Sequence, residues 1–300
     1  MTATTAVTIR EFLDLARETV DGELNRLLPA ADLFPFSIHA AMRHSVFAGG
    51  KRLRPILCME AGKLFQGDEG GILTRACAFE MIHTYSLIHD DLPALDNDDL
   101  RRGKPTCHRA FGEAIAILAG DALLTLAFET LVSPGPPSGE SKLRVAHELS
   151  QAIGTRHGMV GGQVADLESG AEKVDAARLE YIHSSKTGAL IRMAVRAGAI
   201  YAEATEEEVA GVTSYGEKVG LAFQIVDDLL DETGSTQALG KTAGKDKEQH
   251  KATYPALYGV DASLRKASEL VEEACQAIDI YGGRAQRMQS LAHFLVERTS

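Results

Sequence analysis

Apolar residues recur at steps of three and four along most of this chain, and this periodicity constrains its fold more than any other feature. The clearest apolar stripe consists of Val209, Val212, Gly216, Val219, Phe223, Val226 and Leu230. Residues at these steps share one face of a helix. Runs of alternating β-branched and polar residues, which are typical of strands, are absent from the sequence. The pattern therefore predicts an all-α protein.

Comparable spacing predicts the other helices, at residues 8–28, 37–47, 53–64, 71–91, 111–131, 142–157, 175–199, 261–280 and 286–296. Ser37 is a candidate N-cap for the second of these helices. Residues 133–139 are rich in Pro and Gly and predict a surface loop, whereas residues 233–251 are rich in Gly and Lys and predict a loop that closes over an anion. No composition break divides the chain, so we expect one domain over residues 1–300.

The composition is that of an ordinary globular protein, with 45% hydrophobic and 24% charged residues. The formal net charge is −11, so the chain has no overall basic field that could hold a nucleic-acid backbone. We therefore expect no nucleic-acid partner. An anionic substrate must be held locally, by clustered Lys and Arg residues or by metal ions.

Features of cysteine placement and hydropathy indicate a cytoplasmic protein. The cysteines lie far apart and form no C-x-x-C pair, so we expect reduced thiols at Cys58, Cys77, Cys107 and Cys275. The N-terminal segment has no basic region followed by an apolar one, so we expect no export signal. The most apolar stretches, residues 114–128 and 187–201, contain charged side chains, so we also expect no membrane span.

Two clusters of aspartates are the strongest candidates for chemistry. The first, DDLPALD, contains Asp90, Asp91 and Asp96, and the second, DDLLD, contains Asp227, Asp228 and Asp231. A solvated acidic helix end is the alternative interpretation of either cluster taken alone. Both clusters follow apolar helices, however, and buried carboxylates repel one another unless a cation neutralises them. Mg²⁺ suits such oxygen ligands and takes substrate phosphates as its remaining ligands.

The two clusters differ in local geometry. Asp227 and Asp231 stand four residues apart, so both lie on one helix face and can share a cation. In the first cluster, Pro93 disfavours helix at the residue before it. We therefore expect that helix to end near Asp91 and the following bend to bring Asp96 back.

Basic residues gather in two further segments. GGKRLRP supplies Lys51, Arg52 and Arg54, and RRGKPT supplies Arg101, Arg102 and Lys104 directly after the first acidic cluster. Scattered surface charge is the ordinary alternative for either segment. Guanidinium groups match phosphate oxygens in a bidentate manner. Beside metal ligands, these residues therefore indicate a diphosphate site.

A glycine-rich segment imitates a nucleotide-binding P-loop but does not match it. Five residues rather than four separate Gly234 from Gly240, and a predicted helix rather than a strand precedes them. Charge alone keeps three lysines of this segment as candidates for phosphate contact: Lys241, Lys245 and Lys251.

Six segments, in this order, resemble the motifs of trans-type short-chain prenyl diphosphate synthases: GGKRLRP, SLIHDDLPALDNDDLRRGKPTCH, GGQVADLE, KTGALI, GLAFQIVDDLLD and KATYPAL. The resemblance implies the all-α isoprenoid-synthase fold, with helices around a deep central cavity, and a homodimer. The implied reaction is the head-to-tail condensation of an allylic diphosphate, dimethylallyl or geranyl diphosphate, with isopentenyl diphosphate. The implied cofactor is Mg²⁺, which would assist the ionisation of the allylic substrate.

The resemblance also assigns roles to individual residues. The implied metal ligands are Asp90, Asp91, Asp96, Asp227, Asp228 and Asp231. The allylic diphosphate would be held by Arg101, Lys186 and Lys241, and the allylic cation by the Lys186 backbone, Thr187 and Gln224. The isopentenyl diphosphate would be held by Lys51, Arg54, His83 and Arg102. Gln163 and Asp166 resemble a pocket-lining pair, for which core hydrogen bonding is an equally good explanation.

Side chains just before the first acidic cluster are expected to set the product length. Tyr85, five residues before Asp90, is bulky, while Ser86 is small. This arrangement, together with the long DDLPALD form, resembles bacterial farnesyl diphosphate synthases. Farnesyl diphosphate is therefore the favoured product, and geranylgeranyl diphosphate is the nearest alternative. A terpene cyclase would not need two basic clusters, and a noncatalytic partner subunit should have lost an acidic motif, whereas both are intact here.

Overall fold

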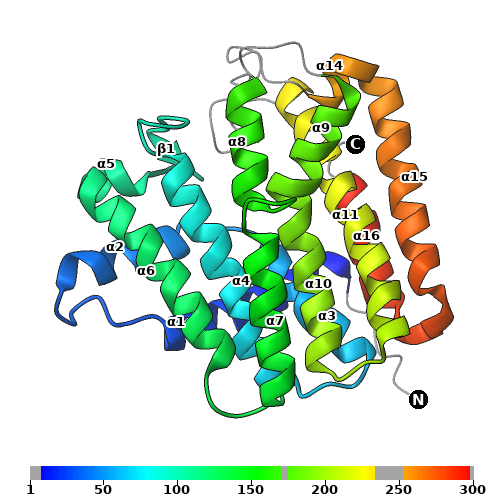
Figure 1. Cartoon of the computed structure of the whole chain (residues 1–300), viewed down its shortest axis with the longest axis horizontal. Helices are drawn as coiled ribbons and strands as arrows, with labels where there is room; N and C mark the ends of the chain where they lie inside the picture. The colour runs from blue at the N-terminus through cyan, green and yellow to red at the C-terminus, as the bar shows by residue number, and fades with distance from the viewer. Residues whose placement is uncertain (1–7, 170–174, 234–252, 298–300) are drawn as a thin grey trace.

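Helices make up nearly all of the regular structure in the computed structural model, which describes residues 8–169, 175–233 and 253–297 (Figure 1). The α-helices are α1 (Ile9–Leu27), α2 (Phe36–Val46), α3 (Leu53–Leu64), α4 (Glu69–Asp90), α5 (Cys107–Phe111), α6 (Glu113–Val132), α7 (Gly139–Ala152), α8 (Met159–Ser169), α9 (Ala176–Ile182), α10 (Ala189–Tyr201), α11 (Glu206–Thr233), α14 (Tyr254–Tyr258), α15 (Val260–Ile278) and α16 (Gln286–Val296). A π-helical segment, η1 (His183–Gly188), joins α9 to α10, and a 3-10 segment, η2 (Asp279–Arg284), joins α15 to α16. The predicted all-α fold is confirmed.

Several predicted boundaries differ from the observed ones for local reasons. The N-cap assigned to Ser37 is wrong, because α2 already begins at Phe36, after Pro35. The helix predicted at 142–157 ends at Ala152, and a turn leads into α8. The periodicity did not reveal α8, because two glycines near its start weaken the helical pattern. The helix predicted at 175–199 is divided into α9, η1 and α10.

The helix α10 lies within the bundle and is almost entirely buried. It packs against α3, α7 and α11, while α4 packs against α3 and α6, and α11 packs against α15. A buried hydrogen bond from the Tyr215 hydroxyl to the Met288 carbonyl, 2.7 Å long, ties α11 to α16. The four cysteines are buried and unpaired by disulfides, in agreement with the expectation of reduced thiols.

The packing brings the ends of α4 and α11 to one end of the bundle, the upper end in Figure 1. A hairpin of two short antiparallel strands, β1 (Leu100–Arg101) and β2 (Lys104–Pro105), lies at this end together with α8, α9 and α14. The sequence did not predict the hairpin. Both aspartate clusters therefore occupy the same end of the molecule.

The helix α6 is the one helix of the described residues that is long and apolar enough to span a membrane by length and composition. Core helices of soluble proteins share these properties. In this chain α6 packs against α4, α2, α5 and α7, and it buries Ala116, Ala119 and Leu123. The absence of a membrane span stays a prediction.

Candidate active site

The first aspartate motif forms the bend that the sequence predicted. α4 ends at Asp90, and the Asp96 backbone N–H donates to the Asp90 carbonyl at 2.8 Å. The backbones of the two residues are thereby held close together. Burial raises the pKa of Asp90 to about 6; nearby Lys186 opposes this rise, and Asp96 adds to it.

Asp91 faces a basic side chain of the hairpin. It is 3% exposed and forms an ion pair with Arg101, whose Nε lies 3.1 Å from Asp91 Oδ1. Arg101 Nη2 also lies 3.4 Å from Asp98 Oδ2. Burial raises the pKa of Asp91, and the hydrogen bond from Arg101 opposes the rise. Arg101 therefore lies beside the first motif, as predicted, with Asp91 fixing its guanidinium plane.

The second motif lies in the last turns of α11, and its middle residue is the most constrained. Asp228 is 5% exposed and accepts hydrogen bonds from Gln224 Nε2 at 3.0 Å and from the Tyr254 backbone N–H at 2.9 Å. His183 Nε2 lies 3.3 Å from Asp228 Oδ2. Asp227 is half-buried and electrostatically coupled to Arg54. The second motif therefore faces the basic residues.

Lys186 connects the π-helical segment to the first motif. Its Nζ donates to Asp166 Oδ2 at 2.7 Å. Burial opposes the charge of Lys186, but the carboxylates of Asp166 and Asp90 outweigh burial and raise the pKa of the ammonium group. The sequence allowed two roles for Asp166, pocket lining and core hydrogen bonding. The structure pairs it with Lys186, a predicted substrate-binding residue.

A glycine of α8 permits this arrangement. A Cβ added at Gly162 would lie 2.3 Å from the Lys186 backbone nitrogen, closer than real contacts allow. α8 and η1 therefore approach each other closely because residue 162 has no side chain. Thr187, the neighbour of Lys186 in η1, is half-buried.

The residues predicted to hold isopentenyl diphosphate form a dense positive cluster. Arg54 is 9% exposed, and its Nε has no hydrogen-bond partner in the described part of the chain. Burial lowers the pKa of Arg54 to about 10; Glu80 opposes this shift, and Arg102 adds to it. Burial also lowers the pKa of His83 well below its usual value, and the charges of Arg54 and Arg102 lower it further. This concentration of positive charge around a neutral histidine suits an anion.

Two other basic residues of this region differ in environment. Arg52 is buried and has its own carboxylate partners, with 2.7 Å contacts to Asp21 and Glu80, so it supports the fold. Lys51 is exposed at the surface next to it. Lys241, the remaining predicted phosphate ligand, lies outside the described residues, as do Lys245 and Lys251.

The carboxylate donors fit Mg²⁺ in pairs. Within the described ranges, no three His, Cys, Asp or Glu side chains gather into one metal-binding group. Mg²⁺ is commonly bound by one or two carboxylates, with water and substrate phosphates completing its octahedron. Asp90 with Asp96, and Asp227 with Asp231, are the candidate pairs.

Tyr85 and Ser86 lie at the first motif, but they differ in packing. Tyr85 is 8% exposed, and its ring meets the His89 ring edge-on at 5.8 Å. Burial raises the pKa of Tyr85 to about 12, with Asp90 contributing. Ser86 is half-buried, and its hydroxyl donates to the His83 carbonyl at 2.9 Å.

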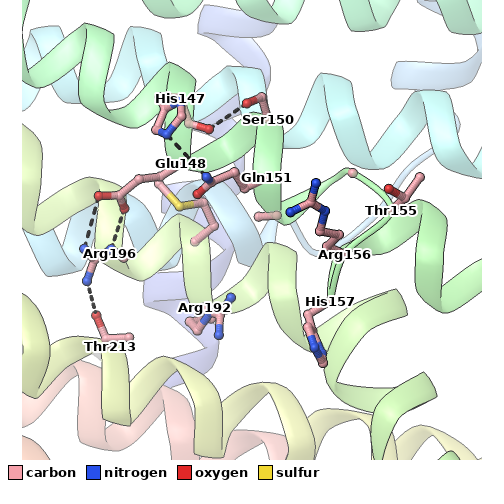
Figure 2. A pocket seen from close by; sticks show the side chains of 13 residues that line it. His147, Glu148, Ser150, Gln151, Thr155, Arg156, His157, Arg192, Arg196 and Thr213 are labelled. Atoms are coloured by element: carbon pink, nitrogen blue, oxygen red, sulfur yellow. Dashed lines mark hydrogen bonds and ion pairs between the residues drawn. The ribbon is translucent and has the colours of Figure 1, made fainter.

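A cavity of about 930 Å³ lies elsewhere, between α7, α10 and α11 (Figure 2). Its lining includes Arg196, which is held by Glu148 at 3.1 Å and by the Thr213 hydroxyl at 3.0 Å. The predicted substrate and metal residues do not line it. This cavity is therefore separate from the candidate active site.

An all-α bundle that presents two aspartate motifs beside a basic anion site is the architecture of an isoprenoid-synthesis enzyme. The chain belongs to the Polyprenyl synthetase family, which matches residues 36–291. It has the all-α isoprenoid-synthase fold that the motifs predicted, and its activity is short-chain prenyl transfer.

Relatives with different names have similar levels of identity to this chain. A dimethylallyltranstransferase of Fischerella ambigua is 47% identical over 96% of this chain and 83% of its own length. Geranylgeranyl pyrophosphate synthase 12 of Arabidopsis thaliana, a chloroplastic protein, is 50% identical over 91% of this chain and 76% of its own length. The solved structure of an FPP/GFPP synthase from Zymomonas mobilis superposes with a TM-score of 0.87, at 36% identity over 97% of this chain and 100% of that one.

Proposed function

We propose that the chain condenses dimethylallyl or geranyl diphosphate with isopentenyl diphosphate, with Mg²⁺ as cofactor, and releases farnesyl diphosphate as the main product. The observation that carries the product length is Tyr85, whose buried aromatic ring lies about one and a half helical turns before Asp90. A prenyl chain that grows past the first motif along α4 would meet this ring.

We propose the following roles for the side chains of the site in binding the allylic substrate. Asp90, Asp96, Asp227 and Asp231 would hold Mg²⁺, which when bound neutralises the leaving diphosphate. Arg101 and Lys186 add fixed positive charge on the side of the first motif. Each of the two is kept in place by a carboxylate, Asp91 for Arg101 and Asp166 for Lys186.

Other residues would protect the allylic cation and deliver the second substrate. Gln224 donates its amide N–H to Asp228, so its carbonyl dipole is the end that can face a cation, as can Thr187 and the Lys186 backbone. Arg54, Arg102, His83 and Lys51 would hold isopentenyl diphosphate while its double bond attacks the cation. The proton lost afterwards would pass to the released diphosphate.

Geranylgeranyl diphosphate is the second candidate product, because several relatives at 46–50% identity are named geranylgeranyl pyrophosphate synthases. The deciding experiment incubates the purified chain with Mg²⁺, isopentenyl diphosphate and either dimethylallyl or geranyl diphosphate, followed by mass spectrometry of the product. We expect a farnesyl-length product. A geranylgeranyl-length product would keep the reaction but overturn Tyr85 as the stop, and no elongation would overturn the proposed function.

We also propose that two copies associate through α6. Ile117, Leu118 and Val132 of this helix are 45%, 51% and 55% exposed, which leaves an apolar face uncovered. Light scattering should report a dimer for the unmodified chain and a monomer for Leu118→Lys. Leu15→Lys, at an exposed leucine of α1, is the matched control and should stay dimeric. A Leu118→Lys variant that stays dimeric would place the interface elsewhere.

A further inference from the structure

His183, the first residue of η1, is buried beside the second aspartate motif. It is 4% exposed, and its Nε2 lies 3.3 Å from Asp228 Oδ2. The ring of Tyr254 stacks on the His183 ring, with centroids 6.2 Å apart and planes 22° apart. The backbone N–H of Tyr254 donates to the same carboxylate oxygen at 2.9 Å. One oxygen of Asp228 is thus approached by residues of two other elements.

Among the described residues, the polar contact of this ring is with Asp228. His183 Nδ1 is buried and has no hydrogen-bond partner in the described part of the chain. Nε2 must carry a proton, because an unprotonated Nε2 would set its lone pair against a carboxylate oxygen. The Nε2–H therefore faces Asp228.

These contacts leave the Asp228 carboxylate little freedom. Gln224 of α11 holds Oδ1, while His183 of η1 and Tyr254 of α14 approach Oδ2. Fixing Asp228 also fixes the rotation of the last turns of α11 and therefore the direction of the neighbouring Asp227. In the same π-helical segment, Lys186 follows His183 by three residues, and π-helical turns are frequent at functional sites.

We propose that His183 is a positioning residue for Mg²⁺-dependent diphosphate binding: through Asp228 it fixes the second aspartate motif relative to Lys186. The proposal rests on the proposed function, because it assumes that the two motifs hold a diphosphate through metal ions. Mutating a residue that orients a metal ligand without touching the metal typically lowers metal affinity about 10–100-fold.

The test measures binding of inorganic diphosphate to the full chain by calorimetry, with and without Mg²⁺. His183→Phe keeps an aromatic ring to stack on Tyr254 but removes Nε2–H, and we expect the Mg²⁺-dependent affinity to fall about 10–100-fold. His183→Gln carries an amide N–H that reaches the position of Nε2, and it should restore most of the affinity. In turnover assays, the KM for isopentenyl diphosphate should stay near its original value, since Arg54 and His83 are untouched.

A control separates positioning from loss of packing. Tyr215→Phe also removes one buried polar contact of an aromatic residue, the hydrogen bond to the Met288 carbonyl. It should lower the unfolding temperature without changing diphosphate affinity. Unchanged affinity in His183→Phe, or equal losses in the Phe and Gln variants, would overturn the inference alone. An unmodified chain that binds no diphosphate with Mg²⁺ would overturn the proposed function as well.

Discussion

Asp90 is the residue at which stability and turnover should separate. Burial raises its pKa from the usual 3.8 to about 6, so the folded protein holds this proton more tightly than the unfolded chain. The contribution of Asp90 to the free energy of unfolding is therefore most favourable below pH 3.8. It is lost as the pH rises to about 6, and above that value the ionised carboxylate is a constant cost.

The substitution Asp90→Asn removes this cost. At neutral pH without metal, we expect an unchanged or higher unfolding temperature by calorimetry, while kcat falls about a hundredfold or more. Near-normal turnover would exclude Asp90 as a functional ligand.

Tyr85 should set the product length through the bulk of its ring. Tyr85→Ala removes that bulk, so we expect products longer than farnesyl diphosphate in a mass-spectrometric assay. The truncation also opens a cavity in a buried position, at a cost of about 3–5 kcal/mol in the free energy of unfolding. Tyr85→Phe keeps the ring and should leave the product distribution unchanged. The same products from both variants would show that another side chain stops the growing chain.

At the residue scale, the sequence could predict side chains but not their distant partners. The aspartates and arginines followed from local motifs. The contact between His183 and Asp228, by contrast, joins η1 to α11, and the pair of Lys186 with Asp166 joins η1 to α8. No local spacing encodes such contacts, because they depend on how separate helices pack. Arg52, which the motif grouped with Arg54, serves the fold because Asp21 and Glu80 lie beside it.

At the scale of elements, helical periodicity located most helices but not the π-helical segment. The segment spans only six residues, too few for the apolar pattern to distinguish a wider turn from an ordinary one. α8 and the β1–β2 hairpin were also missed, since glycines obscure the first and the second is too short to alternate. These three elements carry Lys186, Asp166 and Arg101, so the least predictable elements position the site.

The close approach of α8 to η1 should be essential for both stability and activity. Gly162→Ala would place a Cβ 2.3 Å from the Lys186 nitrogen, so η1 must shift. We expect a lower unfolding temperature and a kcat reduced about tenfold or more, because small displacements of binding groups are costly for catalysis. Gly22→Ala is the control: nothing lies within 4 Å of its added Cβ, and it should stabilise α1 by about 0.5–1 kcal/mol. Full activity in Gly162→Ala would show that η1 tolerates displacement.

The whole molecule is acidic, yet under the proposed function it must attract two diphosphates, and this contrast predicts a dependence on metal. With a net charge of −11, the proposed binding would rely on the local cluster around Arg54 and on cations held by the aspartates. The sequence motifs predicted the local basic and acidic clusters. That both aspartate motifs meet at one end of the bundle could be seen only from the fold. Chelation by EDTA should therefore abolish turnover, and excess Mg²⁺ should restore it. Because the apolar core lies in the packed helices, circular dichroism should show an intact helical fold throughout. Turnover that persists in EDTA would exclude metal-assisted ionisation.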